Sequence, residues 1–311
     1  MSAGLLPPAG AATIASWLAR WPAIALFVTG VILLGMERPG RRGVGPLAVL
    51  AALALVIVAA PAGHPAWAAL AGGLLVATLA RDPRDPLDAE CALKLLWVIG
   101  PALALSWAGL ALLTLATGTP VAREQWAVLE LGLDPRFLWN TALPLALLAG
   151  LVMLGGAPFH FWVADLLQGA RPWIGAAGVV ALQTCGAAWI SQRLDGIVAF
   201  PAGRQVVSDE IGFAAIAAFG AGAATLLVQR RPERRVGTLA SLNGGLVLAW
   251  FASGQPLDPV SFALWAGHLA LALAGASTLA RFMPTFVGQA PGPPLFRRHP
   301  WSGIAGLYAL A

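Results

Sequence analysis

The residues of this sequence that could do chemistry are ionisable and amide side chains set inside long apolar runs. Glu90 and Lys94 lie four apart in AECALKLLW, so on a helix they share a face and can form an ion pair. His160 has a side chain that can titrate near neutral pH. A charge in the middle of a membrane is costly and is usually functional. The candidates are Glu90, Lys94, His160, Asp165, Gln183, Asn243 and His268.

Each candidate also has a structural alternative. Glu90 follows the charged stretch RDPRDPLDAE, so it can cap the start of a helix, and Lys94 can extend back towards the headgroups. A lone histidine such as His160 can be a hydrogen-bonded structural residue. Gln183 and Asn243 are the polar residues of their runs and suit hydrogen bonds between helices. His268 lies in mid-run, where a neutral imidazole needs two hydrogen-bond partners.

A break in the apolar pattern occurs in Met153–Arg171, MLGGAPFHFWVADLLQGAR. Gly155, Gly156 and Pro158 interrupt the run, and Pro158 lacks the backbone N–H that a helix interior needs. Inside a membrane, the carbonyls freed by such a break must find partners in protein or in water, which is typical of a cavity wall. We therefore expect a discontinuous helix here that lines a polar cavity.

The composition identifies the solvent of these runs as the lipid bilayer. The chain is 59% hydrophobic and 11% charged, with a mean hydropathy of +0.77 over 311 residues. Cys91 and Cys185 lie in apolar runs and suggest neither a disulfide framework nor a metal site. The first basic residue is Arg20, so the pattern of a cleavable signal peptide is missing. The arginines are scattered over short loops, which argues against a nucleic-acid partner.

The apolar segments predict an all-α fold, a polytopic integral membrane bundle of nine or ten transmembrane helices. The predicted segments are 21–36, 44–60, 66–80, 91–116, 138–156, 173–191, 211–228, 236–251 and 262–280, with a tenth beginning at Trp301. If the 37–43 loop is cytoplasmic, that side collects thirteen arginines and the opposite side five. The N-terminus is then expected outside, and a bacterial inner membrane is the expected location.

Three blocks of the sequence resemble the antiporter-like membrane subunits of complex I. The stretch MLGGAPFHFWVADLLQG is similar to the family run GxAPFHFWxPEVxQG. AECALKLLWVIG resembles EAALKYFLLG, and ERRVGTLASLNGGLVL resembles LRRLLAYSSIAHAGYLL. The order of the blocks matches the family, and the closest resemblance is to NADH:quinone oxidoreductase subunit N, the counterpart of mitochondrial subunit 2. The same fold also serves multisubunit cation/proton antiporters and membrane-bound hydrogenases.

This resemblance implies a division of the chain and a mechanism. Residues 1–65 would be N-terminal transmembrane helices, 66–281 an antiporter-like core, and 282–311 a cytoplasmic loop with the start of a final helix. In the family, a broken helix and buried Glu, Lys and His residues carry protons. Glu90 matches the buried glutamate, and His160 the histidine of the PFH motif. NADH, flavin, iron–sulfur clusters and quinone are expected on partner subunits of the membrane complex, with no cofactor on this chain.

The sequence departs from the family at three positions. Met153 and Gln183 stand where the family has lysines. Gly244 stands where the family has a histidine; if one residue is deleted in this sequence, the matching position is Asn243. Two functions therefore compete: a subunit that takes part in proton translocation, and a structural subunit of the same complex that conducts nothing. Loss of the two lysines removes groups whose shifted pKa values would let protons move.

Overall fold

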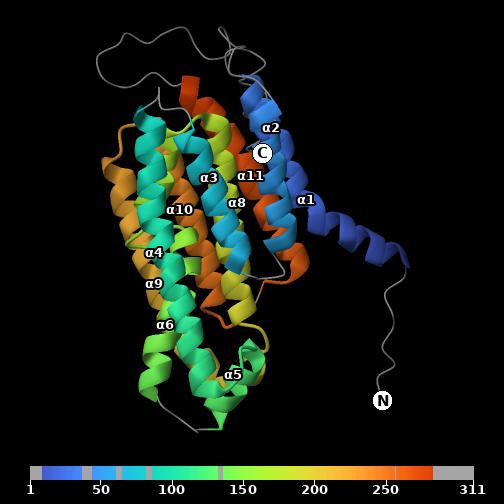
Figure 1. Ribbon diagram of the computed structural model, residues 1–311, viewed down its shortest axis with the longest axis vertical. Coiled ribbons are helices and arrows are strands. Elements are labelled where there is room, and N and C mark those ends of the chain that lie inside the picture. The colour runs from blue at the N-terminus through green and yellow to red at the C-terminus, as the bar shows by residue number, and fades with distance from the viewer. Residues whose placement is uncertain are drawn as a thin grey trace.

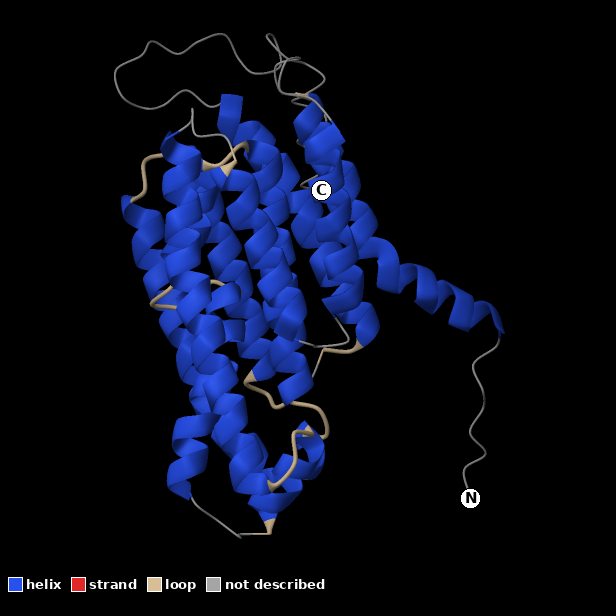
Figure 2. Ribbon diagram, viewed as in Figure 1, coloured by secondary structure: helices blue, strands red, loops and turns tan. Residues whose placement is uncertain are grey.

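The described part of the protein is built from helices alone. A computed structural model describes residues 9–36, 44–60, 65–81, 86–131, 136–255 and 257–282. Figures 1 and 2 show helices packed side by side, and no strand occurs in these ranges. The helices are α1 (Ala9–Gly35), α2 (Val44–Ala59), α3 (Pro65–Ala80), α4 (Pro86–Thr117), α5 (Ala122–Glu130), α6 (Arg136–Met153), α7 (Phe161–Gly169), α8 (Pro172–Arg193), α9 (Pro201–Val228), α10 (Pro232–Phe251) and α11 (Pro259–Phe282), with a 3-10 turn, η3 (Ile197–Ala199).

These helices confirm the predicted integral membrane bundle. The nine predicted apolar segments appear as α1 to α4, α6 and α8 to α11. Four helical stretches are long and apolar enough to cross a bilayer, namely 88–117, 172–199, 201–228 and 259–280. Shorter apolar helices occupy 20–35, 45–59, 66–80 and 140–153. The predicted tenth segment at Trp301 lies outside the described residues.

Proline sets the start of several helices. Pro172, Pro201 and Pro232 stand in the first turns of α8, α9 and α10, where the missing N–H has no helical partner to lose. The predicted starts were later, at Cys91 for α4 and Ile211 for α9. Both helices include polar first turns, which an apolar pattern does not count although free N–H groups there favour polar neighbours.

Helix α8 forms the centre of the bundle (Figure 1). Every residue from Trp173 to Ile190 is buried, and α8 contacts α1, α2, α3, α6, α7, α10 and α11. Glycines allow this close packing: a Cβ at Gly178 would lie 2.7 Å from Leu75 Cδ2, and one at Gly186 would lie 2.9 Å from the Gly150 carbonyl oxygen. Helices α4 and α9 lie at the periphery. Only 28% and 22% of the most apolar stretch of each is buried, against 94% for α8.

The start of α11 is capped by Asp258, which gives a pH-dependent prediction. Its Oδ1 accepts the N–H groups of Val260 and Ser261, both at 3.0 Å. The Ser261 hydroxyl and N–H hold the pKa of Asp258 below its ordinary value. Because the pKa of Asp258 is lower in the folded than in the unfolded protein, its ionised carboxylate stabilises the fold at any pH above the unfolded-state pKa. This contribution is lost in acid, below about pH 4, as the carboxylate of the folded protein becomes protonated. We expect Asp258→Asn to flatten this acid limb in detergent unfolding curves; an unchanged limb would contradict the cap.

Candidate functional site

The predicted helix break lies between α6 and α7 and is confirmed. Helix α6 ends at Met153 and α7 begins at Phe161. Gly155 has a φ of 78°, a left-handed conformation that favours glycine, and the Ala157–Pro158 peptide is cis. Gly155 and Gly156 are buried, whereas Pro158 is exposed on the outside of the bundle. The break therefore turns its glycines inward and its proline outward.

Protein side chains donate hydrogen bonds to backbone carbonyls at the break. The Trp162 indole N–H donates to the Val152 oxygen at 2.8 Å, and the Ser241 hydroxyl donates to the His160 oxygen at 3.2 Å. The Gln183 amide donates to the Leu154 oxygen at 3.1 Å. We expected these groups to line a polar cavity, and this stays a prediction. Side chains from α7, α8 and α10 supply hydrogen-bond donors to these three carbonyls.

Gln183 ties three parts of the bundle together. Its side chain is fully buried in α8, and its Nε2 also donates to the Ala240 carbonyl oxygen of α10 at 3.0 Å. One amide group thus holds the end of the α6 segment and the middle of α10 against α8. The interhelical hydrogen bond anticipated for this residue is confirmed, and it involves a group that carries no charge.

The three departures from the family pattern meet at this point. A Cβ at Gly244 would overlap the Leu154 carbonyl oxygen and lie 3.4 Å from Gln183 Nε2. Met153 is 1% exposed, and its Cβ lies against Gly186, one turn along α8 from Gln183. Any side chain at position 244 would therefore displace the backbone of the break. Methionine, glutamine and glycine together form a closely packed, neutral contact between α6, α8 and α10.

A network of charges lies at the end of the bundle where α4 and α10 begin. Lys94 pairs with Glu90 at 2.7 Å and with Asp165 of α7 at 3.4 Å. Asp165 also accepts Arg234 of α10 at 2.9 Å. A second pair joins Asp88 to Arg171 at 3.5 Å. Salt bridges therefore connect α4, α7 and α10 at one level of the bundle.

The expected pair of Glu90 and Lys94 is present and lies at the surface of this chain. The side chains of Glu90 and Lys94 are 56% and 45% exposed. Because α4 begins at Pro86, Glu90 falls near its first turn and not in the middle of a span. This placement agrees with the alternative in which Glu90 stands at the start of the helix.

The two histidines have different surroundings. His160 is half-buried, and its Nε2 lies 3.2 Å from the Thr225 hydroxyl of α9. That hydroxyl also contacts the Ala221 carbonyl oxygen of its own helix, to which it donates at 2.7 Å. His268 is exposed on α11, and its role as a proton-path candidate stays a prediction. Asn243 is half-buried on α10.

Several residues of this region were not singled out by the sequence. Arg234 was counted only as a loop arginine, although it lies in α10 and connects that helix to the charge network through Asp165. Ser241 and Thr225 are isolated hydroxyl residues, whose hydrogen bonds depend on which helices pack together. No group of three His, Cys, Asp or Glu side chains suited to a metal ion occurs among the residues that the structure describes.

The charge network gives a stability prediction. Asp165→Asn leaves Lys94 and Arg234 without their shared carboxylate, so we expect it to lower the free energy of unfolding by about 1–2 kcal/mol, discounted for partial exposure. The matched control is Asp209→Asn on α9, an exposed carboxylate that accepts Gln205 at 3.0 Å. Thermal unfolding in detergent measures both; equal effects would show that the network contributes nothing specific.

Comparison with known proteins identifies the fold. No family model and no curated protein matches the chain. Among solved structures, a chain of respiratory complex I from Thermus thermophilus, determined with bound aureothin, matches with a TM-score of 0.66 and 20% identity. The match covers 94% of this chain and 64% of that chain, so this sequence spans a little less than two thirds of its structural relative. The chain therefore shares the fold of a respiratory complex I chain.

Proposed function

We propose that this chain is a membrane-arm subunit of a respiratory complex related to complex I, most similar to subunit N. In this complex it has a structural role and does not conduct protons through its broken helix. The fold match and the three sequence blocks support the first statement. NADH, flavin, iron–sulfur clusters and quinone would be bound by partner subunits. The proposed setting is a bacterial inner membrane with the N-terminus outside and no nucleic-acid partner.

The main support for a structural role is the contact of Gln183 with the helix break. A proton path needs groups that gain and lose protons, and such groups owe their pKa values to charged or buried surroundings. The amide of Gln183 does not titrate, and it occupies the Leu154 and Ala240 carbonyls that could otherwise bind water. The close approach of Gly244 to Leu154 leaves little room for a water chain.

A second function has its own supporting observation. Glu90, Lys94, Asp165 and Arg234 form consecutive ion pairs across three helices, which could relay a proton at the end of the bundle. A hydrogenase or a multisubunit cation/proton antiporter is the alternative host complex, since both use the same fold. The partners that the chain binds would distinguish these hosts.

The experiment is purification of the tagged chain from its native membrane, followed by proton-to-electron measurements on the complex in vesicles. We expect flavin- and iron–sulfur-containing quinone reductase subunits to co-purify. Glu90→Gln should leave the proton-to-electron ratio unchanged, with normal assembly. A lowered ratio would favour the relay, and hydrogenase or antiporter subunits in the preparation would contradict the proposed host.

A further inference from the structure

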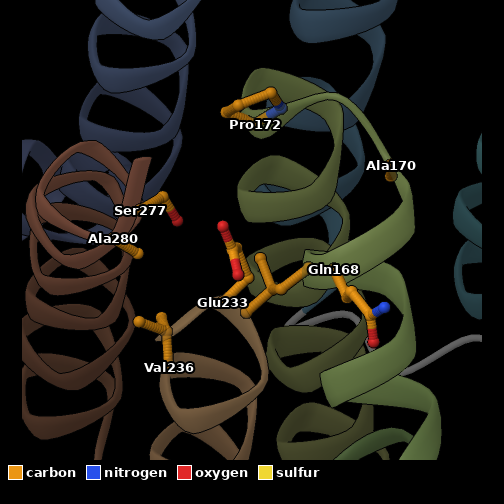
Figure 3. Close-up of a pocket in the computed structure, with 8 residues that line it drawn as sticks. Gln168, Ala170, Pro172, Glu233, Val236, Ser277 and Ala280 are labelled. Carbon is orange, nitrogen blue, oxygen red and sulfur yellow. The ribbon is translucent and has the colours of Figure 1, made fainter. Parts of the chain in front are cut away.

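A small cavity opens where α7 meets α8, beside the start of α10 and the end of α11 (Figure 3). Its volume is about 200 Å³, and it lies apart from the helix break. Ligand pockets for drug-sized molecules are typically about 300 Å³ or larger, so this cavity suits a small polar group. Its lining residues are Leu167, Gln168, Ala170, Pro172, Glu233, Val236, Ser277 and Ala280.

The cavity combines an acidic group with apolar walls. Figure 3 shows the Glu233 carboxylate and the Ser277 hydroxyl pointing into the same space, from α10 and α11. Leu167, Val236 and Ala280 supply apolar surface around them. Glu233 is half-buried, and it joins none of the salt bridges formed among the described residues. A carboxylate with a neighbouring hydroxyl favours a cation that can donate hydrogen bonds.

Positive charge lies just outside the acidic group. Arg231 precedes Pro232 at the start of α10 and is exposed, and Arg230 is exposed beside it. All four helices that line the cavity begin or end here, at the arginine-rich end of a membrane bundle. Headgroups of the bilayer occupy this level. The start of α10 therefore combines an acidic cavity with two exposed arginines that precede it in the sequence.

We propose that this cavity binds the headgroup of phosphatidylethanolamine. Its primary ammonium would donate to Glu233 and Ser277, while its phosphate would lie near Arg230 and Arg231. The ammonium has hydrogens to donate, whereas the trimethylated ammonium of phosphatidylcholine has none and is bulkier. Phosphatidylglycerol offers the phosphate without a cation. The site thus distinguishes the three lipids by the chemistry of one small group.

Native mass spectrometry of the full-length protein in detergent, with defined mixtures of these three lipids, tests the proposal. Loss of one charge-assisted hydrogen bond at a half-buried site reduces affinity roughly tenfold. We expect the wild type to retain phosphatidylethanolamine in preference to the other two lipids. Glu233→Gln should reduce that preference by about this factor, whereas Asp209→Asn at the other end of the bundle should preserve it.

Two results would overturn the proposal. The first is a wild type without preference for phosphatidylethanolamine, and the second is a Glu233→Gln variant that keeps the preference. Ser277→Ala keeps the carboxylate and removes one acceptor, so it should give a smaller loss than Glu233→Gln. Thermal unfolding of each variant shows whether the fold is intact.

Discussion

Gly244→Ala should prevent the chain from accumulating as a folded protein. The added Cβ would overlap the Leu154 carbonyl oxygen, which is backbone and is fixed by the Gln183 amide. Overpacking a tight core typically costs about 1–3 kcal/mol and sometimes more, because backbone must shift. Here the shift would also break the hydrogen bond between Gln183 and Leu154. The measurement is the yield of monodisperse protein in detergent, together with its unfolding temperature.

The control for this prediction is Gly220→Ala. Gly220 lies within α9, and a Cβ there meets nothing within 4 Å. Replacing a glycine inside a helix by alanine stabilises the helix by up to about 1 kcal/mol when space allows. The two variants should therefore change stability in opposite directions. Normal yield and stability for Gly244→Ala would show that α10 and the break are separated by enough space to hold water.

Gln183→Leu should be the second most damaging change. Leucine fills much of the same volume but donates no hydrogen bond. The Leu154 carbonyl oxygen then loses its donor in a buried place, and the Ala240 oxygen of α10 loses its side-chain partner. A buried polar group left unsatisfied costs about 1–3 kcal/mol, so we expect a loss of roughly 2–4 kcal/mol, measured by thermal or denaturant unfolding in detergent.

Gln205→Leu provides the comparison for this variant. Gln205 is exposed on α9 and bonds only to Asp209 among the contacts described for its side chain, at 3.0 Å. Surface changes of this kind usually alter stability by less than about 0.5 kcal/mol. If Gln183→Leu were as mild as Gln205→Leu, water would be replacing the amide, and the break would be hydrated.

Apolar periodicity and proline placement were sufficient to predict most of the fold. The segments 44–60 and 66–80 correspond closely to α2 and α3, because both are apolar along their whole length and contain little polar sequence. The break at Pro158 was predicted because glycine and proline interrupt a helix wherever they occur in an apolar run. Helix α5 was not predicted, since its sequence AREQWAVLE is short and only partly apolar.

The arrangement of the candidate side chains was harder to predict, because it depends on which helices are neighbours. His268 and Gln183 are both polar residues within apolar runs, yet Gln183 faces the centre and His268 faces outward. No pattern along one helix distinguishes them, as α8 is apolar on all sides. The spacing of Glu90 and Lys94 predicted their pairing, while Asp165 and Arg234 joined them only through packing of α7 against α4 and of α10 against α7.

Hydrogen–deuterium exchange at the break between α6 and α7 tests most directly whether the proton path through the broken helix is closed to water. The Gly155 and Gly156 N–H groups donate to the carbonyls of Val152 and Leu151 at 3.0 and 2.8 Å, and both residues are buried. Our account predicts that these amides exchange as slowly as those in the centre of α8. Exchange as fast as in exposed loops would place water at the break, and would contradict a neutral, closely packed joint between α6 and α7.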